Sequence, residues 1–174
     1  RNFFRSTKNH NTVTIDDEEQ ARFKSTFEIF NDCKPSILKV RINDNLISIQ
    51  CGHTGYSRLN KNISYIRYIH IIESNEINIV ITDKVISSTP INVRNNLGSD
   101  LQWNKDKYQN TYNSGPFKII FENLFCKIDL ERNMYSRKNL CLKEGVSFKW
   151  ILNKKKLNNE RYVYRSRFRL VLNN

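Results

Sequence analysis

The chain has 174 residues and carries 29 lysines and arginines against 17 aspartates and glutamates, a formal net charge of +12 at pH 7. It contains one alanine and one methionine but many β-branched and aromatic residues, a composition that argues against a helical bundle. No segment approaches the roughly 18 consecutive apolar residues of a membrane-spanning helix, so no membrane span is expected.

The charge is distributed unevenly along the chain. Residues 1–100 carry 13 basic and 11 acidic side chains, a net charge of +2. Residues 101–174 carry 16 basic and 6 acidic side chains, a net charge of +10. Such asymmetry predicts an anionic partner, either a charged polymer or an anionic lipid surface, and the second half of the chain as the part that contacts it.

The length favours one domain, which on folding would bury roughly 70% of the surface of the unfolded chain. Residues 1–13 are basic and polar and have no clear apolar periodicity. We therefore divide the chain into a basic N-terminal arm, residues 1–13, and a single β-domain, residues 14–174.

The segment from Asp16 to Phe30 fits two kinds of secondary structure. Four consecutive acidic residues, 16–19, suit the N-terminus of a helix, and Phe23, Phe27 and Phe30 would share one helical face. Phe23, Phe27 and Ile29 also fit the alternation of a strand. We expect a short helix that passes into a strand.

From Pro35 onward the pattern is that of β-strands. Apolar and polar residues alternate, and turn-forming pairs such as Asn43-Asp44 separate the runs. Residues 95–100 are expected to form a loop. Strands are expected at 38–42, 46–51, 63–72, 77–81, 91–94, 117–121, 124–130, 146–152 and 161–172, where 117–121 and 124–130 can join into one. The pattern predicts an all-β, mainly antiparallel β-sandwich, jelly-roll-like with about eight strands.

The strand at 146–152 predicts part of the core. Its alternation places Phe148, Trp150 and Leu152 on one face, because successive side chains of a strand point to opposite faces of the sheet. If this face is buried, truncating Phe148 or Trp150 removes a large part of the core.

The final strand, 161–172, predicts a binding surface. Arg165, Arg167 and Arg169 alternate with Ser166, Phe168 and Leu170, so one face of the strand is a row of guanidinium groups about 7 Å apart. Like charges in a row repel each other, which favours a polyanionic partner. Because the aromatic residues lie on the opposite face, we expect contacts with phosphate groups and no base-specific recognition. The candidate nucleic-acid-binding residues are Lys154, Lys155, Lys156, Arg161, Arg165, Arg167 and Arg169.

Motifs for catalysis or metal binding are weak. Cys51 and His53 could lie close together, but no second pair at metal-ligand spacing accompanies them, and phosphate-binding glycine loops are absent. We expect no catalytic residues, no metal and no cofactor. The cysteines are widely spaced, and free thiols are favoured over the three possible disulfide pairings. These cysteines are Cys33, Cys51, Cys126 and Cys141.

A small β-sandwich with a basic arm and an arginine-faced final strand, Tyr162 to Leu172, resembles the single jelly-roll capsid proteins of small, mostly circular single-stranded DNA viruses. The resemblance is one of layout and charge over the whole chain, and it assigns no individual residue. It implies a structural protein of the virion that self-assembles as a homo-oligomer and binds packaged nucleic acid, and it implies no enzymatic activity.

Three other classes of protein fit the same features. One is a nucleic-acid-binding component of a ribonucleoprotein assembly. Another is a secreted or surface β-sandwich with disulfides that binds acidic glycans or a receptor. The third is a lipid-transport or membrane-docking module, because residues 90–103 resemble the Asn-containing β-repeats of large lipid-transfer proteins.

Overall fold

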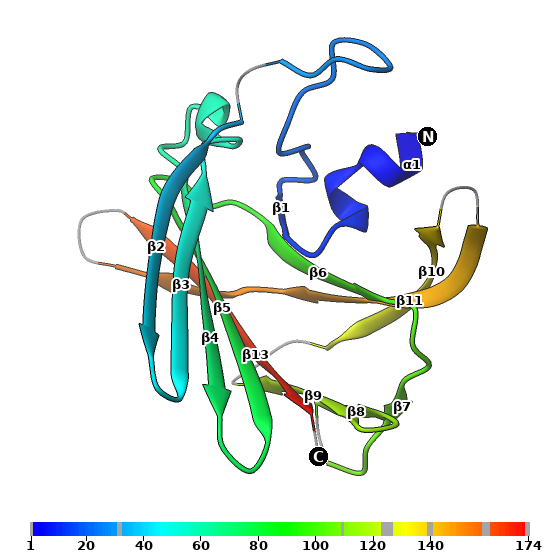
Figure 1. Ribbon diagram of the computed structural model, residues 1–174. Helices are drawn as coiled ribbons and strands as arrows, with labels where there is room; N and C mark the ends of the chain where they lie inside the picture. Colours follow the sequence, from blue (N-terminus) through cyan, green and yellow to red (C-terminus); the bar gives the residue numbers. More distant parts are fainter. Residues whose placement is uncertain are drawn as a thin grey trace.

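The computed structural model describes residues 2–30, 33–108, 110–122, 127–138, 141–157 and 161–172. They form two antiparallel sheets packed face to face, with the strands of the smaller sheet crossing those of the larger one at a steep angle (Figure 1). This confirms the expected all-β, antiparallel sandwich. The sandwich is larger than expected, because the described residues form thirteen strands where about eight were predicted.

The larger sheet contains most of the strands. Along the sheet, the order is β2 (Pro35–Asn43), β3 (Leu46–His53), β4 (Ser64–Glu73), β5 (Ile77–Ser87), β13 (Tyr162–Leu172), β9 (Phe117–Glu122), β8 (Thr111–Ser114) and β7 (Asn104–Lys105). A short strand, β12 (Asn153–Lys156), also pairs with β13. The first four strands follow each other as hairpins, as their alternating sequence and tight turns predict.

The smaller sheet has the order β1 (Val13–Ile15), β6 (Val93–Ser99), β11 (Cys141–Ile151) and β10 (Asp129–Lys138). Its strand β6 covers most of the segment 95–100 that was expected to be a loop. That expectation was wrong because the asparagines of this segment are buried and hydrogen-bonded, with Asn95 fully buried. Of the expected strand at 124–130, residues 123–126 lie outside the described residues, and β10 begins at Asp129.

Two apolar clusters fill the space between the sheets. The aromatic cluster contains Phe148 and Trp150, which are 0% and 2% exposed, so the predicted buried face of this segment is confirmed. Its members are Leu97, Tyr112, Ile119, Phe121, Ile128, Phe148, Trp150 and Phe168. The second cluster lies around β1 and consists of Val13, Ile15, Tyr56, Ile63, Tyr65, Val85, Ile91, Val93, Leu152 and Tyr164.

The smaller sheet does not cover the whole inner face of the larger one. Leu38, Val40 and Ile42 on β2 are 74%, 53% and 72% exposed, although they lie in register with core residues of the central strands. In Figure 1, β2 forms the outer edge of the larger sheet. The packed core therefore lies away from β2, around β1, β5, β6, β9, β11 and β13.

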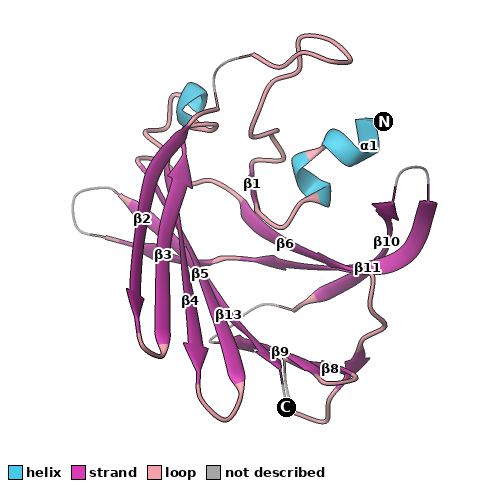
Figure 2. Ribbon diagram, in the orientation of Figure 1, coloured by secondary structure: helices cyan, strands magenta, loops and turns pink. Residues whose placement is uncertain are grey.

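The helices are short and lie elsewhere than expected (Figure 2). Helix α1 spans Asn2–Arg5, and the 3₁₀ helices η1 and η2 span Thr7–Asn9 and Ser57–Leu59. The helix expected within residues 16–30 is absent from that segment, all of which is described. No described helix has the length and apolarity needed to cross a membrane.

The acidic cluster at 16–19 does not cap a helix; its carboxylates accept hydrogen bonds and form an ion pair instead. The carboxylate of Glu19 accepts hydrogen bonds from the Ser6 hydroxyl at 2.6 Å and the Thr7 backbone N–H at 2.5 Å. Asp16 accepts a hydrogen bond from the backbone N–H of Asn92 at 2.8 Å and pairs with Lys61 at 2.6 Å. These carboxylates tie the N-terminal segment to the sandwich, and Asp16 has a positive φ of 51° that a helix does not allow. The division into an arm at 1–13 and a domain at 14–174 stays a prediction.

Candidate anion-binding site

Strand β13 has an unusual set of neighbours. On one side it pairs with β5 along its whole length. On the other side, β12 pairs with its first half, from Tyr162 to Arg165, and β9 pairs with its second half, from Arg167 to Leu172. The two partner strands therefore meet beside Ser166, and side chains from three distant parts of the sequence come together there.

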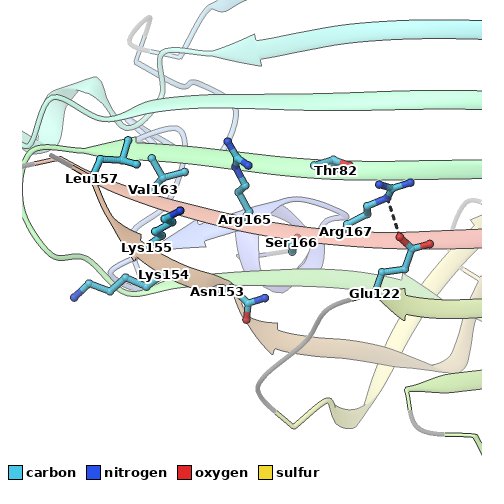
Figure 3. Close-up of a pocket in the computed structure, with 10 residues that line it drawn as sticks. All are labelled: Thr82, Glu122, Asn153, Lys154, Lys155, Leu157, Val163, Arg165, Ser166 and Arg167. Carbon is cyan, nitrogen blue, oxygen red and sulfur yellow. Dashed lines mark ion pairs between the residues drawn. The ribbon is translucent and has the colours of Figure 1, made fainter.

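A pocket of about 610 Å³ lies at this junction (Figure 3). It is lined by Thr82, Glu122, Asn153, Lys154, Lys155, Leu157, Val163, Arg165, Ser166 and Arg167. Four of these residues are basic, and Glu122 is the one acidic residue among them. With all groups ionised, these described lining residues carry a net charge of +3, and this favours an anionic ligand.

At one end of the pocket, the described side chains include positive charges and no acidic partner. Arg165 is exposed and lies opposite Lys84 of β5 and opposite Asn153 of β12. Paired residues of an antiparallel ladder project to the same face, so two cations and an amide meet there. Lys155, two residues after Asn153, belongs to the same face of β12. Among the described residues, no acidic side chain forms an ion pair with Arg165.

The other end of the pocket holds a carboxylate between two guanidinium groups. Glu122, the last residue of β9, lies opposite Arg167 in the ladder. Its Oε2 is 2.9 Å from Arg167 Nε, and its Oε1 is 3.6 Å from Arg169 Nε. The second distance exceeds that of a hydrogen bond, and Arg169 Nε is buried without a hydrogen-bond partner in the described part of the chain. At this end of the pocket, the carboxylate of Glu122 therefore offsets one of the two positive charges of Arg167 and Arg169.

The structure brings together four of the seven basic residues selected from the sequence. Lys154, Lys155, Arg165 and Arg167 line the pocket. Arg169 lies next to it, with Glu122 between itself and Arg167. Lys156 is exposed on β12 outside the lining, and Arg161 contributes to a separate pocket of about 350 Å³ with Asn62 and Ser64.

The sequence did not point to Glu122, Asn153, Thr82 or Lys84. Each comes from another strand and meets β13 only through the sheet topology. The one local signal was the isolated acid Glu122 in the strongly basic second half of the chain. The sequence alone could not show which arginine Glu122 would contact.

Cys51 and His53 lie two residues apart on β3. Burial raises the pKa of the Cys51 thiol. Burial, and then the charge of Arg67, lower the pKa of His53, whose ring lies beside those of Tyr56 and Tyr65 at 5.7 Å and 4.9 Å between centroids. Both shifts favour the neutral form of the group.

No group of three metal-ligating side chains occurs among the described residues. Cys51 carries a free thiol. The side chains of Cys126 and Cys141 lie outside what the structure describes, so the question of their pairing stays open.

A buried carboxylate forms a second charged centre on the inner face of the same sheet. Asp83 is fully buried and accepts hydrogen bonds from Arg67 Nε at 2.7 Å, Arg67 Nη2 at 3.0 Å and the Tyr65 hydroxyl at 2.9 Å. The amide of Asn95 also donates to Asp83 and, at 3.0 Å, to Ser166. Burial alone would lower the pKa of Arg67, but the adjacent Asp83 more than offsets this effect and raises it. The network joins both sheets and has a structural role.

The chain is thus an antiparallel β-sandwich with a basic pocket on one face of its larger sheet. The model of the family described as heparinase II/III-like, C-terminal, matches residues 1–156, and the chain belongs to this family. No protein with curated annotation matches the chain.

Two kinds of solved structure share this fold. The heparan sulfate lyase HepC from Pedobacter heparinus superimposes with a TM-score of 0.71 at 16% sequence identity, over 100% of this chain and 26% of that chain. Heparinase III, the BT4657 gene product, with methylated lysines, has a TM-score of 0.69 at 16% identity, over 100% of this chain and 25% of that chain. The chain thus spans about a quarter of the length of these enzymes.

These findings correct several expectations from the sequence. The family match overturns the resemblance to viral coat proteins and, with it, the virion localisation, the capsid function and the nucleic-acid partner. It also overturns the expectation of a protein unrelated to enzymes, because the matched family and structures are those of lyases. The physical reason is that charge and a β-sandwich indicate an anionic partner without distinguishing a phosphate polymer from an acidic polysaccharide.

Proposed function

We propose that the chain is the β-sandwich domain of a polysaccharide lyase that acts on an acidic glycan, and that its basic pocket binds this glycan. The lyase assignment is supported by the family and by the two similar enzymes, one of which is named for heparan sulfate. The observation that carries the binding assignment is the pocket itself, whose described lining holds four basic residues and one carboxylate.

The pocket is suited to hold and orient a charged polymer. Arg165 and Arg167 are two residues apart on one strand, so their guanidinium groups follow each other at about 7 Å along a straight line. A linear polysaccharide presents its acidic groups in a row. Guanidinium groups bind carboxylate and sulfate through paired N–H donors, which fixes the ligand as well as attracting it. Of the seven basic residues selected from the sequence, the four lining residues are the proposed direct contacts, and Lys156, Arg161 and Arg169 are proposed to surround them.

The family match and the pocket support different parts of this proposal. The match ends at residue 156, whereas Arg165 and Arg167 follow it in the sequence. Membership of the family therefore does not depend on the arginine strand. The role of the strand depends on its own geometry and charge.

A titration of the purified chain with glycans tests the proposal. Heparan sulfate oligosaccharides should bind, measured by isothermal titration calorimetry, while a neutral glucan of the same length should not. The affinity should fall as salt rises, because exposed charges are screened over about 8 Å at physiological ionic strength. Equal binding of the neutral glucan, or no binding of the charged one at low salt, would contradict the proposal.

A further inference from the structure

The two ends of the pocket differ in whether a carboxylate of the protein already pairs with the arginine. Arg165 faces solvent with Lys84 and Asn153 beside it. Arg167 faces Glu122, which is attached to the protein and already occupies the position of an anion. An acidic glycan can therefore bind at the Arg165 end directly, but at the Arg167 end it has to compete with Glu122.

We propose that Glu122 is an internal counter-ion that a sulfate group of the ligand displaces, and that the donor of Arg169 beside it makes the pocket selective for sulfate over carboxylate. This inference rests on the proposed function, since it concerns the same pocket. Arg169 thereby becomes the residue that determines specificity, Glu122 lowers the affinity of this end of the pocket for every anion, and Arg165 supplies affinity for any anionic group.

The contacts of Glu122 favour its displacement. Its side chain is 24% exposed and that of Arg167 is 52% exposed, so the pair remains accessible to solvent. Ion pairs of this kind contribute little to stability, because they gain little over their hydrated forms. Swinging the carboxylate aside therefore costs little, and Glu122 is the last residue of β9.

The number of acceptor oxygens explains the preference for sulfate. Glu122 makes one short contact with Arg167 and leaves Arg169 Nε without a hydrogen bond. A carboxylate on the ligand has the same two oxygens as Glu122 and gains little by replacing it. A sulfate group has three terminal oxygens, so it can accept from Arg167 and also from Arg169, whose buried N–H is otherwise unsatisfied.

The spacing defines the ligand further. The subsite at Arg165 and the subsite at Arg167 are about 7 Å apart, as for every second residue of a strand. The ligand should therefore carry two neighbouring acidic groups, and the one that reaches Arg167 should be a sulfate. A polymer whose only acidic groups are carboxylates should bind mainly through Arg165.

The substitution Glu122→Gln tests the inference, because it removes the charge while keeping the size of the side chain. The probes are a heparan sulfate octasaccharide and a polyuronate octasaccharide that carries carboxylates only, each titrated by calorimetry. We expect E122Q to bind the sulfated ligand about fivefold or more tightly than the wild type, and the polyuronate with an equal or smaller gain, because the same competing carboxylate is removed for both ligands. The preference for sulfate should therefore persist.

Glu131→Gln is the matched control. Glu131 is an exposed acid on β10 that pairs with Lys149, so E131Q makes the same change in net charge outside the pocket. If E122Q binds the sulfated ligand no more tightly than E131Q does, or if E122Q weakens binding of both ligands, the inference is wrong. In that case the proposed function still stands as long as the wild type binds the sulfated octasaccharide.

A second variant addresses the case in which E122Q does not fold. Arg169→Gln removes the unsatisfied donor and leaves the Arg167–Glu122 pair in place. It should lower the affinity for the sulfated ligand several-fold and leave the affinity for the polyuronate unchanged. Equal losses for both ligands would overturn the inference.

Discussion

The larger sheet contains two arginine–carboxylate arrangements, and they differ in almost every property except their chemistry. Arg67 and Asp83 lie on the inner face, with side chains that are 15% and 0% exposed, and Asp83 accepts from three different residues. Arg167 and Glu122 lie on the outer face, 52% and 24% exposed, with a single short contact. Burial and the number of donors thus separate a pair that holds the fold from a pair that a ligand can open.

The comparison also explains why the two pairs cannot exchange roles. Asp83 has no path to solvent, so its charge is stabilised only by its neighbours, and the loss of one partner leaves a buried charge. Glu122 can turn to water when its arginine binds something else. The Asp83 arrangement is rigid because every acceptor position of its carboxylate is used. The Glu122 arrangement is adaptable because one donor, Arg169 Nε, has no hydrogen-bond partner among the described residues.

The largest expected effect is on stability, from Asp83→Asn. The substitution leaves Arg67 in its largely buried site without a counter-charge, and it should lower the free energy of unfolding by about 3–5 kcal/mol. Urea denaturation followed by tryptophan fluorescence measures the loss. Glu122→Gln is the control and should cost less than about 1 kcal/mol. Equal losses of stability would mean that the Arg67–Asp83 pair and the Arg167–Glu122 pair do not differ in what they contribute to the fold.

Packing around the aromatic cluster should matter about as much as the buried carboxylate. Phe148→Ala removes a fully buried ring that contacts Trp103, Tyr112 and Phe121, and should cost about 3–5 kcal/mol. The neighbouring Ile151 is 55% exposed, so Ile151→Ala should change stability by less than about 1 kcal/mol. A small loss for Phe148→Ala in chemical denaturation would place the core elsewhere in the sandwich.

A smaller effect should appear in the dependence of stability on pH. Burial, and then Arg67, lower the pKa of His53 in the folded chain, so the fold favours the neutral imidazole. In the unfolded chain the imidazole takes up a proton below about pH 6.5. Stability should therefore be fully present above that pH and decline as pH falls through it.

His53→Phe should flatten this decline, as measured by the melting temperature between pH 5 and pH 8. The control is His10→Phe at an exposed position, which should leave the pH dependence as it is in the wild type. If the slope is the same in the wild type and in H53F, the burial of His53 does not affect stability in this range.

The two arrangements also show what the sequence could and could not predict. Alternation in the final strand correctly separated the exposed Arg165 and Arg167 from the buried Ser166 and Phe168, because a strand has only two faces. The same reasoning predicted the burial of Phe148 and Trp150. It failed at Asn95, because an asparagine in a turn and one in a buried network look the same in the sequence.

The pocket as a whole could not be predicted, since Glu122, Asn153 and Lys84 reach β13 from three other strands. Their positions depend on the strand order, which no local pattern specifies. The function was misjudged for a related reason. A basic β-sandwich is an architecture that many unrelated functions share, and positive charge attracts phosphate, sulfate and carboxylate polymers alike.

The most direct test of the central claim, that the outer-face arginines bind an acidic glycan, is the affinity of the triple variant Arg165→Gln, Arg167→Gln, Arg169→Gln for a heparan sulfate octasaccharide. We expect at least about a tenfold loss of affinity by calorimetry with a loss of stability below about 1 kcal/mol, since these residues lack buried partners of the Asp83 type. The charge-matched control, Lys34→Gln, Lys39→Gln, Arg41→Gln on and beside β2, should lose much less affinity. Equal losses in the two triple variants, or unfolding of the arginine variant with unchanged binding of the residual folded chain, would contradict the claim.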